Sequence, residues 1–212
     1  MYKRIIFFIC LIISQTFSLT LKQIKDNLKL NYIPQDSVEL HLRVIVKTSA
    51  SSSQTDMHIV NKGTNKSYME IKSSFLNQRS IVNGDRMKIV DLASREYKIV
   101  HYNGEPLKEY SYGNFNPLDS GKWNAPKYIS QDLYLIEGDA GSLFYNSKRN
   151  RIEKIHSIKD KADVLTTFEY DVNNNLKKMV VSVDVNGIET VVTTEIFKMR
   201  NSKNFPDRLF DF

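Results

Sequence analysis

The residues of this sequence best suited to chemistry are its four histidines, His41, His58, His101 and His156. An imidazole serves near neutral pH as a metal ligand or as a general acid and base. His41 and His58 occupy polar positions of two alternating segments and would come close together if those segments pair. We find no carboxylate or further histidine at ligand spacing beside either one, whereas a metal site needs at least three convergent ligands. The sequence therefore predicts solvent-facing histidines and no metal site.

No familiar catalytic motif accompanies the histidines. Residues 138–142 (GDAGS) are rich in glycine but join two expected strands, whereas a phosphate-binding loop opens a helix. Residues 171–175 (DVNNN) are similar to part of a calcium-binding loop. This segment, however, lacks the central glycine and the closing glutamate of such a loop. A hydrolase would need a cleft with convergent acid and base groups, and nothing singles out such a pair. We therefore predict no cofactor and no enzymatic activity.

Residues 1–18 have the pattern of a secretory signal peptide. A basic start precedes the apolar residues 5–13, and small residues then lead to a cleavage point after Ser18. The apolar run is too short to span about 30 Å of hydrocarbon. The only cysteine, Cys10, lies in this run, so the mature chain has no thiol. We expect a cleaved signal, export without stable membrane insertion, and a single domain over residues 19–212.

The charge of the mature chain argues against nucleic acid as a partner. The net charge falls from +6 to +4 when Lys3 and Arg4 leave with the signal. The remaining charges are interspersed, and the longest basic excess, residues 148–151 (KRNR), is typical of a solvated turn.

Any site must be positioned mainly by strands. Residues 38–44 (VELHLRV) alternate strictly between apolar and polar, which predicts a strand with one buried face. Similar segments follow as far as residue 199, and Asn83-Gly84 and Asn186-Gly187 are hairpin signals between them. One amphipathic helix is expected before Pro34, with Leu21, Ile24 and Leu28 on its apolar side.

A long irregular stretch interrupts the strands. Residues 102–127 have no clear period but contain several aromatic residues, which favours a lid or binding loop. The fold class expected is therefore mainly β: a strongly curved antiparallel sheet, an open half-barrel of about eleven strands, with a short N-terminal helix and a loop or helix lid. A sheet larger than its cover would leave a concave apolar surface for a ligand.

The large apolar side chains on the expected strands, helix and insert are candidates for lining such a cavity. Flexible or flat side chains accept acyl chains without imposing a fixed shape. The candidates are Ile24, Leu28, Leu40, Leu42, Met57, Ile59, Tyr68, Met87, Ile89, Tyr97, Trp123, Phe168, Tyr170 and Phe197. Ordinary core packing remains the alternative role for each of them.

The order of these features resembles the periplasmic outer-membrane lipoprotein carrier (LolA-like) family. The resemblance rests on a signal peptide and one helix, the hairpin VNGDRMKIVD at 82–91, RIEKI at 151–155, TFEYD at 167–171 and the ending FPDRLFDF at 205–212. It implies a half-barrel closed by a helical lid, with an apolar cavity for the acyl chains of lipoproteins. The family carries an Arg-Pro pair after its second strand, where this chain reads Asn61-Lys62-Gly63. Lys62 is therefore the candidate for locking the lid.

The resemblance also implies partners. They are lipid-modified proteins or lipids, an inner-membrane transporter that donates the cargo, and an outer-membrane acceptor. We expect the carrier to act as a monomer. The alternative is a non-enzymatic protein for envelope interaction or sensing on the same half-barrel, which an apolar patch that stays open would favour.

Overall fold

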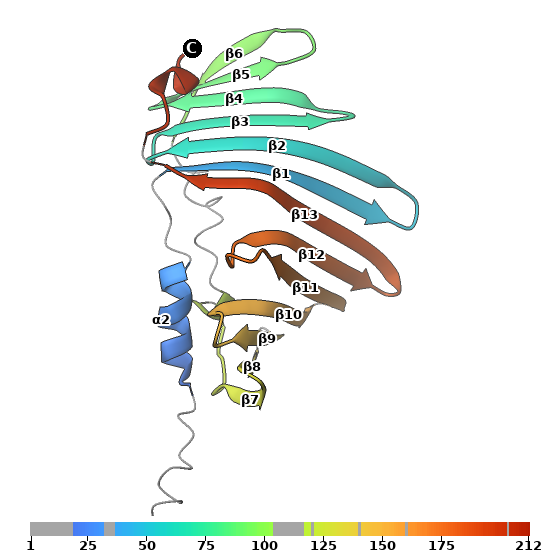
Figure 1. The fold of residues 1–212 in the computed structure, drawn as a ribbon. Coiled ribbons are helices and arrows are strands. Elements are labelled where there is room, and N and C mark those ends of the chain that lie inside the picture. The colour runs from blue at the N-terminus through green and yellow to red at the C-terminus, as the bar shows by residue number, and fades with distance from the viewer. Residues whose placement is uncertain are drawn as a thin grey trace, which may run out of the picture.

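The computed structural model of the chain describes residues 19–31, 37–103, 117–119, 121–139, 141–159, 161–202 and 204–212. The expected signal peptide and residues 104–116 of the irregular stretch lie outside this part of the chain. The described residues form one antiparallel sheet of 13 strands (Figure 1). The strands are β1 (Ser37–Thr48), β2 (Ser52–Lys62), β3 (Lys66–Ser73), β4 (Asn77–Asn83), β5 (Arg86–Asp91), β6 (Tyr97–His101), β7 (Lys127–Ser130), β8 (Leu133–Gly138), β9 (Gly141–Asn146), β10 (Arg151–Lys159), β11 (Ala162–Tyr170), β12 (Leu176–Val185) and β13 (Ile188–Asn201).

The sheet is curved and open, because β6 and β7 form its two edges (Figure 1). This confirms the predicted fold class, with thirteen strands where about eleven were expected. β7 begins at Lys127, in a stretch expected to be irregular. Apart from β6 and β7, consecutive strands pair as hairpins, and in the described part of the chain the one pairing between strands distant in sequence joins β1 to β13, with Val38 opposite Asn201. That pairing unites the two halves of the chain in one sheet.

Two turns show how the local sequence sets the hairpins. Asn186 and Gly187 both have positive φ angles, 54° and 82°, as a two-residue type I′ turn between β12 and β13 requires. Between β4 and β5 the turn lies one residue later than predicted. Asn83 still pairs with Arg86, and Gly84, with φ of 65°, is the first residue of the turn.

In the described residues, three short helices accompany the sheet: α2 (Leu21–Asn31) and the 3₁₀ turns η1 (Pro117–Asp119) and η2 (Asp207–Phe210). α2 begins with a capping box. The backbone N–H of Gln23 donates to Thr20 Oγ1 over 3.2 Å, and the Thr20 N–H donates to Gln23 Oε1 over 2.8 Å. A helix of this length needs packing to persist in water. Its packing partner is the sheet.

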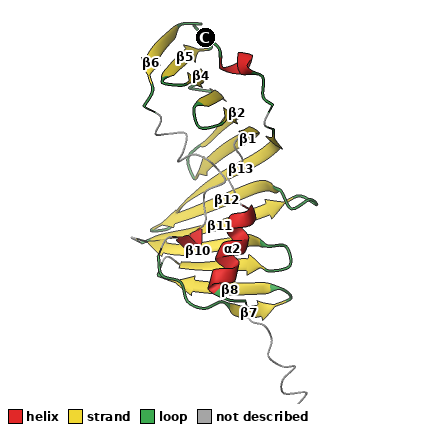
Figure 2. Cartoon of the chain, turned by 90° about the vertical axis from the view of Figure 1, so that its left-hand side faces the viewer, coloured by secondary structure: helices red, strands yellow, loops and turns green. Residues whose placement is uncertain are grey.

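The two faces of the sheet are covered at opposite ends. α2 lies across the strands around β8 to β11 (Figure 2) and contributes Ile24 and Leu28, both 0% exposed, to a core with Leu118, Tyr134, Ile136, Leu143, Tyr145 and Ile152. The C-terminal segment, residues 204–212, packs against β2–β4, where Phe205 and Phe210 join Val60 and Ile81. Cross-strand register places these two cores on opposite faces. We call the face under α2 the helix face and the other the tail face.

Candidate functional site

The helix face is apolar and the tail face carries the charge. In β1, Leu40, Leu42, Val44 and Val46 alternate with Glu39, His41, Arg43, Ile45 and Lys47. Because directly paired residues share a face, the register extends both series across the sheet. Leu40 lies between Ile59 and Met199, for example, whereas His41 lies between His58 and Lys198. At the paired positions of β1–β4 and β11–β13, the helix face carries no charged residue.

Most of this apolar face is left partly exposed by the described residues. α2 covers only the end formed around β8–β11, so the middle of the sheet keeps half-buried Val, Ile and Met side chains. They include Val44, Met57, Ile59, Met69, Ile71, Met87, Ile89, Val164, Met179, Val181, Val192 and Ile196. A contiguous apolar surface of this kind marks an interaction or ligand site. It is the candidate functional site, and we call it the apolar face.

Seven of the predicted site residues lie on the helix face. Leu40 and Leu42 are buried at its centre, and Phe168 packs against the core beneath α2. The others are Met57, Ile59, Met87 and Ile89. From the predicted lid, Ile24 and Leu28 of α2 close one end of this face. The structure thus brings these nine residues to one side of the sheet.

Trp123 also reaches this end of the sheet. It forms a β-bridge with Gly138, and the backbone N–H of Asn124 donates to Glu137 O over 2.8 Å. A Cβ at position 138 would lie 2.3 Å from the carbonyl oxygen of Lys122, so only glycine permits this approach. The indole then packs against the core under α2. Trp123 therefore packs against the same core that holds Ile24 and Leu28 of α2.

α2 is also tied to the sheet by polar contacts. Tyr145 donates its hydroxyl proton to Asn150 Oδ1, and Asn150 Nδ2 donates to the carbonyl oxygen of Asn27 over 3.3 Å. Burial raises the pKa of Tyr145, which keeps the phenol a donor. The buried tyrosine thus links the core of β9 to the helix.

Three predicted cavity residues lie on the tail face instead. Tyr68 pairs with Val60, packs under the C-terminal segment and donates to Glu70 Oε2 over 2.8 Å. Tyr97, on the edge strand β6, is 64% exposed and pairs with Val90. Phe197 is 61% exposed and lies beneath the Arg43 guanidinium. The aromatic character of these residues suggested a cavity, but strand alternation directs Tyr68 and Tyr97 away from the apolar face, and a bulge does the same for Phe197.

Phe197 also shows the effect of a register shift. The pairing of β1 with β13 shifts between His41 and Leu42, which are opposite Lys198 and Ile196. Phe197 is the extra residue of this bulge. A bulge changes which side chains point inward, and the alternation of β13 alone does not reveal it. Tyr170, by contrast, is held at the end of β11, where its hydroxyl donates to Ile152 O over 2.5 Å beneath the Arg151 guanidinium.

Lys62 locks a different segment from the one predicted. Its ammonium donates to the carbonyl oxygen of Phe205 over 2.8 Å and to Asp207 Oδ1 over 3.0 Å, and Lys66 contacts the same carboxylate at 2.7 Å. These contacts hold the C-terminal segment on the tail face, whereas α2 lies on the helix face. The assignment of Lys62 to a helical lid is corrected accordingly, because the side chain of this β2 residue points to the tail face.

Replacing Lys62 by methionine is therefore expected to loosen the C-terminal segment and to leave α2 unchanged. The substitution keeps the length of the side chain but removes both donated hydrogen bonds, while Lys66 retains its ion pair. Amide hydrogen exchange should become faster in residues 204–212 and stay the same in residues 21–28. Lys22→Met, on the exposed side of α2, is the control. Faster exchange in α2 alone would contradict the contact pattern.

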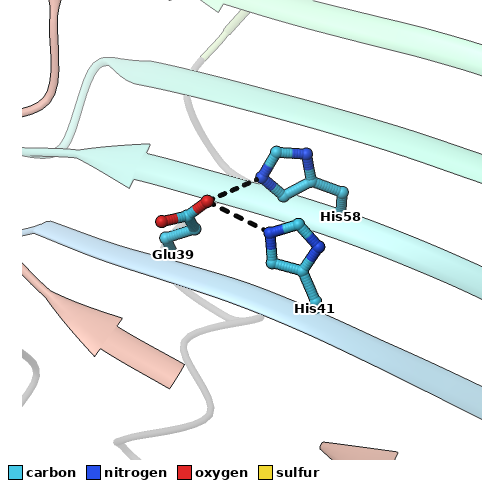
Figure 3. A group of neighbouring side chains, drawn as sticks. All are labelled: Glu39, His41 and His58. Carbon is cyan, nitrogen blue, oxygen red and sulfur yellow. Dashed lines mark hydrogen bonds and ion pairs between the residues drawn. The ribbon is translucent and has the colours of Figure 1, made fainter. Parts of the chain in front are cut away.

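The register also reveals a polar cluster that the sequence prediction missed. Glu39 Oε1 lies 3.1 Å from Nε2 of His41 and 3.2 Å from Nε2 of His58 (Figure 3). Burial alone would raise the pKa of Glu39, but hydrogen bonds from His41 and Lys198 and the charges of Lys198 and Arg200 lower it to about 2. The signal was present in the sequence, because Glu39 and His41 are two residues apart in a strand and must share a face.

Among the described residues, no helix is long and apolar enough to cross a membrane.

Comparison with solved structures identifies the fold. A LolA superfamily protein from Nitrosomonas europaea superposes with a TM-score of 0.56 at 14% identity, over 92% of this chain and 98% of its own. A domain assigned to outer-membrane lipoprotein sorting, from Vibrio parahaemolyticus, gives a TM-score of 0.55 at 11% identity, over 89% and 95%. No family model and no curated protein matches the sequence. The chain therefore has the LolA-like fold that the sequence resemblance implied.

Proposed function

We propose that this chain is a periplasmic carrier that binds the acyl chains of lipoproteins or other lipids on its apolar face and shuttles them towards the outer membrane. The observation that carries the proposal is that, at the paired positions of β1–β4 and β11–β13, the helix face carries no charged residue, whereas the charged side chains lie on the tail face. The LolA-like fold supports the same function. In this proposal residues 1–18 are removed and residues 19–212 act as one monomeric, non-enzymatic domain.

The mechanism is partition of acyl chains out of water. Each methylene group that becomes buried contributes about 0.8 kcal/mol, and the half-buried Val, Ile and Met side chains of the apolar face have no strong hydrogen-bonding groups that would be left unpaired. Met57, Met69 and Met87 are flexible enough to follow chains of different shape. Binding of this kind does not require recognition of a headgroup. It therefore suits a set of different cargo molecules that have only their acyl chains in common.

α2 and the segment around Trp123 border this site rather than cover it. They are packed on the end of the sheet around β8–β11, and the partly exposed surface begins beside them. Cargo would lie along β12, β13, β1 and β2, with the helix as a wall. An inner-membrane transporter would supply the cargo, and an outer-membrane acceptor would receive it.

The test is native mass spectrometry with lipid extraction on the mature protein purified from an envelope fraction. We expect diacyl or triacyl species at about one per chain. A protein that arrives empty and also fails to bind a fluorescent fatty acid would overturn the carrier function. The apolar face would then be assigned to protein interaction or envelope sensing on the same fold.

A further inference from the structure

Two paired strands bring three metal-ligating side chains together on the tail face. Glu39 and His41 are alternate residues of β1, and His58 is the direct cross-strand partner of His41 in β2. Both Nε2 atoms point at the same carboxylate oxygen (Figure 3), and the three ligand atoms all lie within 4.8 Å of one another. The two imidazole rings are stacked, with centroids 3.9 Å apart. We propose that Glu39, His41 and His58 form a binding site for a divalent transition-metal ion of the zinc type.

The spacing of the ligand atoms fits such an ion. Zinc binds imidazole nitrogen and carboxylate oxygen at about 2.0–2.2 Å in a tetrahedron, which puts neighbouring ligand atoms about 3.3–3.5 Å apart. The two histidine nitrogens lie 3.1 Å and 3.2 Å from Glu39 Oε1. The His41 and His58 side chains are 38% and 31% exposed, which leaves both imidazole rings room to turn towards a shared ion. Two imidazoles and one carboxylate are nitrogen and oxygen donors, which favour zinc, nickel or copper over magnesium or calcium.

The cluster is anchored by its carboxylate. Only 10% of the Glu39 side chain is exposed, so this ligand is held in place. A carboxylate must be ionised and an imidazole neutral before either can bind a cation, so a bound ion has to displace any proton from the two Nε2 atoms.

Two cations from β13 compete for the same carboxylate. Lys198 Nζ lies 3.1 Å from Glu39 Oε1, and Arg200 Nη2 lies 3.0 Å from Oε2. The contact of Arg200 with the buried Oε2 atom is an ion pair without hydrogen-bond geometry. Lys198 is 48% exposed on its side chain, so it can move into solvent when an ion takes its place at Oε1. This competition weakens the site, and it predicts that removing Lys198 strengthens metal binding.

The proposed site lies beside an open groove of about 370 Å³. His41 and His58 line it together with the charged side chains of Arg43, Asp56, Glu70 and Lys72. Three protein ligands leave the fourth tetrahedral position for water or an external ligand from this groove. The ion would also link β1 to β2 directly behind Leu40 and Ile59 of the apolar face.

Isothermal titration of the mature chain with Zn²⁺ alone, at pH 7.5, tests the site. We expect one ion per chain, and His58→Ala should weaken binding at least about tenfold, since loss even of groups that only support metal ligands costs 10–100-fold. Lys198→Met should bind more tightly than the unmodified chain. His156→Ala is the matched control, because His156 forms a similar exposed contact with Asp163 at 2.7 Å and should leave binding unchanged.

Thermal unfolding provides a second readout, because an ion that binds the folded state raises its Tm. Zn²⁺ should raise the Tm of the unmodified chain and of His156→Ala, and should have a smaller effect on His58→Ala. The proposal is overturned if no ion binds at millimolar Zn²⁺. It is equally overturned if His156→Ala weakens binding as much as His58→Ala, which would show only scattered surface binding. Lipid binding by the apolar face is measured separately and is not needed for either outcome.

Discussion

Replacing Val181 by aspartate is expected to lower the affinity for a fluorescent fatty acid at least about tenfold, equivalent to about 1.4 kcal/mol. Val181 lies in the middle of β12, between Thr166 of β11 and Val192 of β13, on the apolar face. A carboxylate there stays hydrated only if the acyl chain leaves, because an ion placed against hydrocarbon without a partner is strongly disfavoured. Equilibrium titration of the probe measures the effect.

The adjacent residue supplies the control. Val180 is the same residue type with the same half-buried character, but it pairs with Thr167 and Thr193 on the tail face. Val180→Asp changes net charge and strand propensity as Val181→Asp does, so both should shift the Tm by a similar amount. Only Val181→Asp should weaken acyl binding. Equal losses of affinity in the two variants would show that the apolar face is not where the lipid binds.

Replacing Leu28 by alanine is expected to lower the free energy of unfolding by about 2–5 kcal/mol. Leu28 is 0% exposed and packs in the core with Leu118, Tyr134 and Leu143. Truncation removes the transfer free energy of the lost carbons and leaves a cavity between α2 and the sheet. Urea unfolding, followed by the shift in midpoint at constant m-value, measures the change.

Asp26→Ala is the matched control on the same helix. Asp26 is exposed, and surface substitutions of this kind usually change stability by less than about 0.5 kcal/mol. If Leu28→Ala lowers the free energy of unfolding by less than about 1 kcal/mol, the packing of α2 against the sheet would be contradicted. The helix would then act as a mobile lid over the apolar face rather than as a wall beside it.

The local elements could be predicted from the sequence because their signals are short-range. Strict alternation in β1, the Asn-Gly dipeptide before β13 and the spacing of Ile24 and Leu28 each report on neighbours within a few residues. These signals predicted the helix, nearly all the strands and an open antiparallel sheet. They also placed Leu40, Leu42, Met57 and Ile59 together, since each lies in a strand whose pairing partner is the next strand along the chain.

What only the tertiary structure decided is which face each segment covers and which distant strands meet. The β1–β13 pairing joins residues more than 140 positions apart, and its bulge at Phe197 places that ring on the tail face. The contacts of Lys62 with Phe205 and Asp207 also join residues far apart in the sequence, because the C-terminal segment packs beside β2 only in the folded chain. Glu39 and His41 are alternate residues of β1 and therefore share a face, but the register between β1 and β2 was needed to place His58 in the same cluster. Periodicity is a local property of the backbone, whereas register and coverage depend on contacts between segments far apart in sequence.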